Sequence, residues 1–100
     1  MYLDILRHRK KSGIDLEAYR ADAAHMEAMV RRQPGFLTFR RYVDEDGEAI
    51  SISEWKSEDD ARSWANQPEH RAVQVRAQAD YYENYVVYSC ADPEVRSFTA

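Results

Sequence analysis

The order of strand-like and helix-like hydrophobic patterns along the sequence most constrains how this chain can fold. Strand-like alternation is predicted at residues 2–9, 36–44, 49–55 and 81–90. Between them lie two segments with apolar residues at helical spacing of three and four, residues 14–33 and residues 57–80. The chain therefore reads strand, helix, strand, strand, helix, strand.

Turn and capping residues separate these segments. Pro34-Gly35 ends the first helix, because proline cannot continue a helix and glycine tolerates the turn. Glu45-Asp46-Gly47 predicts a hairpin with glycine at a positive φ, and Ser57 predicts an N-cap for the second helix. This order predicts an α+β, ferredoxin-like βαββαβ fold, in which a four-stranded antiparallel sheet carries both helices on one face. One hundred residues without a shift in composition fit a single domain over residues 1–100.

The second helix is interrupted at Asn66-Gln67-Pro68-Glu69. We expect Asn66 to cap the restarted piece, Pro68 to occupy its first turn and Glu69 to take the capping-box position. Trp64 and His70 stand on either side of the break. Six residues correspond to about 600° of rotation on a continuous helix, so only the break allows both side chains to face inward.

The strands carry apolar residues on both faces, although two helices can cover only one. On the last strand, alternation places Tyr82, Val86 and Tyr88 on one face and Tyr81, Tyr85 and Val87 on the other. On the second strand it places Phe36 and Tyr42 on one face and Leu37, Phe39 and Val43 on the other. An uncovered apolar sheet face is typical of an interface. We therefore expect a homodimer with two sheets packed face to face, and a tail at residues 91–100 that reaches the partner through Val95 and Phe98.

Composition argues against several classes of partner. The net charge is −4, and the single basic cluster, residues 7–11, has no interleaved aromatic residues, so no nucleic-acid partner is expected. The apolar runs are too short for a membrane span, and the start of the chain lacks the pattern of a signal peptide. The single cysteine, Cys90, fits a packing role in a reducing, cytoplasmic setting. The three scattered histidines predict no metal site.

Several motifs together resemble the antibiotic biosynthesis monooxygenase family over Tyr2 to about Tyr88. They are Pro34-Gly35-Phe36, Glu54-Trp55-Lys56-Ser57, Trp64, Pro68-Glu69-His70 and the Tyr-rich last strand. The resemblance implies a dimeric α+β barrel. It also implies one of several activities: cofactor-free oxygenation of aromatic polyketides, quinol oxidation or haem degradation, beside members of no known activity.

In such a fold the ligand pocket would lie between the helices and the sheet, with a small aromatic substrate as the partner. Cofactor-free oxygenation needs a base, hydrogen bonds to the developing enolate or phenolate, and a dry cavity. His70 and Trp64 are the candidate catalytic residues, and either His70 or His25 could supply the base, since imidazole titrates near neutrality. Candidate substrate-binding residues are Trp64, His8, His25, Tyr82 and Asn84. The structural interpretation of Trp64 as core and of His70 and His25 as packing residues stays open.

Two other functions also remain open. Haem could bind to His70, since imidazole is the usual axial donor, with Arg7 or Arg9 pairing with its propionates. The haem-degrading branch implies a histidine about one turn later, where Gln74 stands, and an asparagine in the first strand, where residues 7–9 are Arg-His-Arg. The third function is a non-catalytic, ligand-binding dimeric module.

Overall fold

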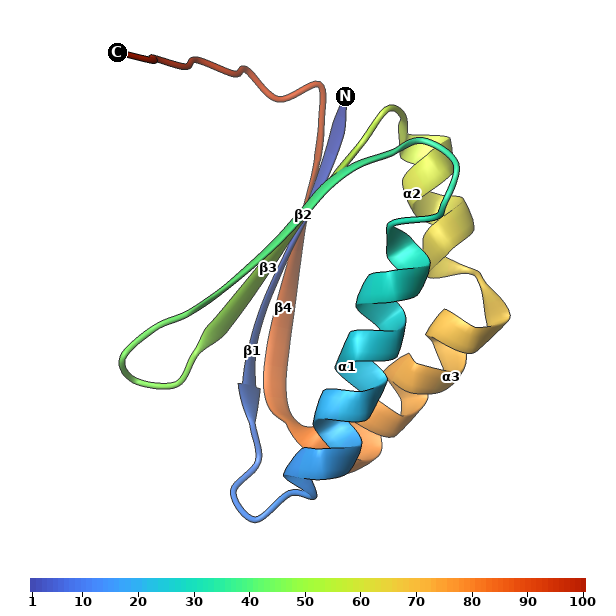
Figure 1. The fold of residues 1–100 in the computed structure, drawn as a ribbon, viewed down its shortest axis with the longest axis vertical. Coiled ribbons are helices and arrows are strands. Elements are labelled where there is room, and N and C mark those ends of the chain that lie inside the picture. Colours follow the sequence, from blue (N-terminus) through green and yellow to red (C-terminus); the bar gives the residue numbers. More distant parts are fainter.

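The computed structural model describes all residues from Met1 to Ala100. The elements, in chain order, are β1 (Tyr2–Lys10), α1 (Leu16–Val30), β2 (Phe36–Val43), β3 (Ala49–Trp55), α2 (Glu58–Ala65), α3 (Pro68–Arg76), the π-helix η1 (Ala77–Tyr81) and β4 (Tyr82–Ala91). The four strands form one antiparallel sheet in the order β2-β3-β1-β4. All helices lie on one side of it (Figure 1). The predicted ferredoxin-like α+β fold is confirmed.

The helix boundaries follow local capping. α1 begins after Asp15, whose carboxylate accepts a hydrogen bond from the backbone N–H of Ala18 at 3.0 Å. It ends at Val30, three residues before the predicted end, and the chain turns through Gly35 at φ +77°. None of the helices has the length and apolar character of a membrane span.

The interruption of the second helix has a different cap from the predicted one. Ser57 caps α2 as expected, with its hydroxyl accepting from the N–H of Asp60. The prediction for Asn66 was wrong, because Asn66 is the C-cap of α2. Gln67 is the N-cap of α3, and its side-chain oxygen accepts from the N–H of His70 at 2.9 Å. Glu69 therefore lies one position too early for a capping box.

Two bulges shift the predicted strand faces. β1 pairs Arg9 with Asn84 but Lys10 with Tyr82, so the residue between them on β4 is extra. As a result Tyr82 lies on the helix-facing side with Tyr85, 6.0 Å away between ring centroids, and not with Val86 and Tyr88 as predicted.

The bulge in β2 has the same effect. Phe36 pairs with Trp55 and Thr38 with Glu54, which leaves Leu37 as the extra residue. Phe36 and Phe39 both pack against the helix-side core, so grouping Phe36 with Tyr42 was also wrong.

The far face of the sheet has no covering layer (Figure 1). The register of β1, β3 and β4 places six apolar side chains there, namely Leu3, Ile5, Ile50, Ile52, Val86 and Tyr88. We call this set the open sheet face. The tail after Ala91 extends away from the body, and Phe98 is 90% exposed. Both features leave apolar surface without a partner within the chain.

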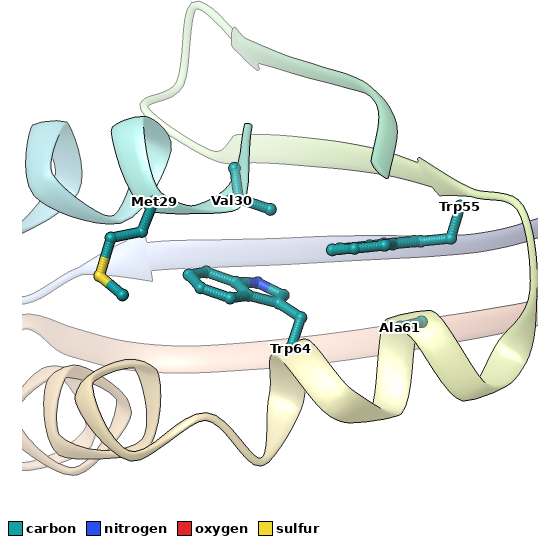
Figure 2. Packing of buried hydrophobic residues seen from close by; sticks show 5 residues of the cluster. All are labelled: Met29, Val30, Trp55, Ala61 and Trp64. Carbon is teal, nitrogen blue, oxygen red and sulfur yellow. The ribbon is translucent and has the colours of Figure 1, made fainter. Parts of the chain in front are cut away.

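The core on the helix side consists of two separate clusters. One holds Met29, Val30, Trp55, Ala61 and Trp64. Its two indoles extend from β3 and α2 into the same space between the layers (Figure 2). The other cluster holds Tyr19, Ala77 and Tyr81, at the opposite ends of α1 and the second helix. With only 10 of 100 residues buried, the interior between the clusters is not filled.

Candidate functional site

A cavity of about 520 Å³ lies between the sheet and the helices, and both core clusters contribute to its walls. Most lining residues are hydrophobic. A volume of this size is within the range of small-molecule sites, which are also largely apolar with a few polar groups. The polar groups therefore decide what the cavity can do.

Trp64 and His70 both line the cavity and contact each other. Their rings are stacked, with centroids 4.1 Å apart and planes at 12°. The break between α2 and α3 allows this contact, since Gln67 restarts the helix with a new rotation. Trp64 also belongs to the core, so it is a core residue and a cavity wall at once.

The protonation of His70 is set by its neighbours. Its Nδ1 lies 2.9 Å from the carbonyl oxygen of Trp64, and a carbonyl only accepts, so Nδ1 carries the hydrogen. The neutral ring then has Nε2 as its basic nitrogen. Burial lowers the pKa of His70, and the hydrogen bond to the carbonyl partly raises it again. His70 is thus a neutral base at pH 7.

His8 is the most deeply buried polar residue. It is 2% exposed and lines the cavity from the central strand β1. Its Nδ1 is the only buried side-chain nitrogen or oxygen without a hydrogen-bond partner. Burial, and then the positive charge of Lys10 and of Arg41, lower the pKa of His8 to about 4. Native proteins rarely leave such an atom unpaired, so this nitrogen is available for a ligand.

Three tyrosines line the cavity together with His8. The ring of Tyr82 is 4.6 Å from that of His8 between centroids. Burial raises the pKa of Tyr82 to about 12, so its hydroxyl is protonated and can donate. Tyr19 and Tyr85 also line the cavity. Tyr85 accepts a hydrogen bond from Gln78 at 2.8 Å, which leaves its own hydrogen free.

The remaining two predicted substrate-binding residues do not line the cavity. His25 is exposed on α1, and its Nε2 lies 2.9 Å from a carboxylate oxygen of Glu69 on α3. Asn84 pairs with Arg9 across the sheet and belongs to the far face. The other four predicted site residues line the cavity in two close pairs, Trp64 with His70 and His8 with Tyr82.

Several cavity residues were missed by the sequence analysis. Asp4, Asp22 and Arg41 line the cavity, although none of them was among the predicted site residues. Asp22 accepts from Arg76 at 2.8 Å and from the Tyr81 hydroxyl at 2.7 Å, and these bonds hold its pKa below the usual range. Alternation along β1, which sets Asp4 on the same face as His8, was the signal that could have found this residue.

The side chains meet some requirements of a haem site. No group of three His, Cys, Asp or Glu residues could hold a bare metal ion. The fixed Nδ1–H of His70 leaves Nε2 as a donor, the arrangement that axial histidines adopt. Arg7 and Arg9, the predicted propionate partners, do not line the cavity and pair with Glu48 and Asp46.

Comparison with known proteins gives a consistent result. The family model described as antibiotic biosynthesis monooxygenase matches residues 11–76. The uncharacterized protein YqjZ of Bacillus subtilis is 33% identical over 69 residues, and the match spans 69% of this chain and 60% of that protein.

Two solved structures show the same fold at low sequence identity. Rv0793 from Mycobacterium tuberculosis superposes with a TM-score of 0.82 at 18% identity, covering 96% of this chain and 98% of its own. SnoaB, described as a cofactor-independent oxygenase from Streptomyces nogalater, gives a TM-score of 0.76 at 19% identity, covering 94% of both chains.

Proposed function

Because the chain belongs to the antibiotic biosynthesis monooxygenase family, we propose that it oxygenates a small aromatic or quinol-type substrate in the cavity without a cofactor. One observation carries the proposal: a neutral imidazole, oriented by the Trp64 carbonyl, lies flat against an indole in an apolar cavity of about 520 Å³. Such a reaction needs a base, hydrogen bonds to the developing anion and a site that excludes water, and His70 and the mostly hydrophobic lining would supply the first and the last. The description of SnoaB as a cofactor-independent oxygenase supports the same choice.

The chemistry can be balanced for an anthrone-type substrate. His70 Nε2 removes one proton from the activated CH₂ group, and the resulting carbanion transfers one electron to O₂. The two radicals combine to form a C–O bond, and the peroxide takes up a proton. Loss of water, which removes the second hydrogen and breaks the O–O bond, leaves a carbonyl. One oxygen atom enters the product and the other enters water, and all four electrons come from the substrate.

Other cavity residues have supporting roles in this proposal. Trp64 holds the substrate ring by stacking on the face that His70 does not cover, or along the indole edge. The Tyr82 hydroxyl donates to the substrate oxygen on which negative charge develops. The His8 nitrogen supplies a second polar contact.

Oxygen uptake tests the proposal directly. Purified protein is supplied with 1,8-dihydroxyanthrone or with a naphthohydroquinone, and consumption is compared with the rate without protein. His70→Gln should lower the rate by about 10²- to 10⁴-fold, the usual contribution of a general base. His25→Gln, which removes a histidine outside the cavity, is the matched control and should keep the rate. Background rates for the whole substrate panel would refute the assignment.

Haem binding is the second candidate function, favoured by the fixed tautomer of His70. Titration with haemin should then shift the Soret band, and His70→Gln should abolish the shift. A shift that survives this substitution excludes His70 as the ligand. Binding of aromatic compounds without any oxygen uptake or haem binding would identify a ligand-binding module.

The assembly and setting are also proposals. We infer a homodimer formed through the open sheet face, because a face with six apolar side chains is typical of an interface. Residues 1–100 then form one domain, with residues 91–100 as an arm that contacts the partner through Val95 and Phe98. The exposed thiol of Cys90 supports a reducing, cytoplasmic location.

A further inference from the structure

One end of the cavity carries a positive charge that has no counter-ion. Arg41 and Arg62 are the two arginines that line the cavity. Arg62 pairs with Glu58 at 3.1 Å. Arg41 contacts no carboxylate, and its one hydrogen bond is a long one of 3.4 Å to the hydroxyl of Tyr19. A guanidinium binds planar anionic groups with two parallel hydrogen bonds, and this one is not used in that way within the protein.

A second cation lies at the same end. The Lys10 ammonium is 4.8 Å from the centroid of the Tyr19 ring and forms no ion pair. Carboxylates that could neutralise this end are engaged elsewhere, since Glu48 binds Arg7 and Asp22 binds Arg76. Arg41 therefore faces the cavity without a carboxylate partner, and Lys10, which does not line the cavity, adds positive charge beside Tyr19.

The orphaned nitrogen of His8 is an independent sign of a ligand at this end. Burial is the main cause of the altered pKa values of His8, Tyr19 and Tyr82, and the positive charge of Arg41 lowers the pKa of each. The geometry agrees: all three line the cavity together with Arg41, Tyr82 packs against the cluster that contains Tyr19, and its ring lies 4.6 Å from that of His8. We call Arg41, Lys10, Tyr19, His8 and Tyr82 the Arg41 end.

Neutral hydrogen-bond donors complete this region. Tyr19 accepts from Arg41, so its own hydrogen is free to be donated. The hydroxyl of Tyr82 has no partner within the protein and remains protonated at neutral pH. One guanidinium, one ammonium and two hydroxyl donors form a set that favours an anionic oxygen over a neutral one.

We propose that the Arg41 end binds an anionic oxygen, a carboxylate or an ionised enol, carried by the aromatic ligand, with Arg41 as the residue that selects for the charge. The inference rests on the proposed function in taking the ligand to be aromatic. It goes further by naming the ionisable group that the ligand must carry. It also orients the ligand, with its anion at Arg41 and its ring extending toward Trp64 at the other core cluster.

Calorimetric titration with two matched pairs of probes tests this inference. The carboxylate pair is 2-naphthoate and the neutral 2-naphthamide. The enolate pair is 2-hydroxy-1,4-naphthoquinone, which is ionised at neutral pH, and its 2-methoxy analogue. In at least one pair the wild-type protein should bind the anionic member at least tenfold more tightly than the neutral one, and that pair identifies the type of oxyanion.

Arg41→Gln should reduce this preference by about tenfold or more, because it removes the charged donor and leaves a shorter, neutral polar side chain. Arg41→Lys, which keeps the charge without the planar fork, should retain part of the preference. Arg40→Gln is the matched control: it is adjacent in β2, also forms no ion pair, and faces the other side of the sheet. Its preference should equal that of the wild type.

Two results would overturn the inference: equal binding of both members in both pairs, or a preference that survives Arg41→Gln. Neither depends on catalysis. Selective binding of the anion without oxygen uptake would support the anion site and refute the proposed reaction. Oxygen uptake without a preference for the anion would support the reaction and refute the anion site.

Discussion

Replacing His8 with leucine tests whether this buried histidine lowers the stability of the folded protein. The imidazole is 2% exposed and one of its nitrogens has no hydrogen-bond partner. An unsatisfied buried polar atom costs about 1–3 kcal/mol, and a leucine of similar volume avoids this term. We therefore expect His8→Leu to equal or exceed the wild-type stability at pH 7.5.

The pH dependence gives the sharper form of this prediction. His8 has a usual pKa of 6.5 and a pKa of about 4 in the folded protein. Between these values the unfolded chain binds the extra proton, so the folded state loses stability as pH falls. The full difference corresponds to about 3 kcal/mol, since each pKa unit is worth about 1.4 kcal/mol, and about 2 kcal/mol is already lost at pH 5.

The assay is urea unfolding followed by far-UV circular dichroism at pH 7.5 and pH 5.0, at one protein concentration. His8→Leu should lose about 2 kcal/mol less than the wild type between the two values. The lowered pKa of His70 contributes in the same direction in both proteins and cancels in the comparison. The charged groups near His8, which are Lys10, Arg41 and Glu48, are unchanged. An equal loss in both proteins would refute the argument that His8 is buried in its neutral form.

Three further predictions concern the scaffold. Gly35→Ala should lower the free energy of unfolding by about 2–4 kcal/mol, because alanine would be forced into a positive φ and its Cβ would overlap the Asp60 side chain. Gly47→Ala, whose Cβ would lie in open space, should lower it by only about 1 kcal/mol in the same urea assay. Asp22→Asn should cost about 1–2 kcal/mol at pH 7 by weakening its bonds to Arg76 and Tyr81. The difference from the wild type should shrink as the pH falls below about 4, because the unfolded chain takes up a proton there while the folded carboxylate, whose pKa is lowered, stays ionised; a constant difference would contradict this. Ile5→Glu, at the centre of the open sheet face, should convert a dimer into a monomer in sedimentation velocity while Arg20→Glu on α1 does not, and a monomeric wild type would remove the inferred interface.

The fold was predictable because the residues at the turns and helix ends determine where each element begins and ends. Ser57 caps a helix by its own hydroxyl, and Gly35 and Gly47 adopt the positive φ that their turns need. The strand faces were not fully predictable, because a bulge arises from pairing between strands and shifts every later side chain by one position. Phe36 and Tyr82 were assigned to the wrong face for this reason.

The candidate site was partly predictable for a related reason. Trp64 and His70 were found because the helix break is visible in the sequence, and the break allows both side chains to face the cavity. Arg41 was missed because a charged residue in a strand usually faces water, and only the three-dimensional arrangement shows that its side chain lines the cavity. Asn84 was chosen for its chemistry alone, and the bulge before it turns it to the far face.

The division of the interior into two clusters has a consequence for how the protein responds to its ligand. A guest molecule in the central space would join Trp64 on one side to Tyr19 on the other, and so supply contacts that the polypeptide itself lacks. Its binding energy adds to that of folding, by about 2.7 kcal/mol when the free ligand is at 100 times its dissociation constant. Melting temperature should then rise with occupancy, which makes thermal shift a direct screen for the natural compound.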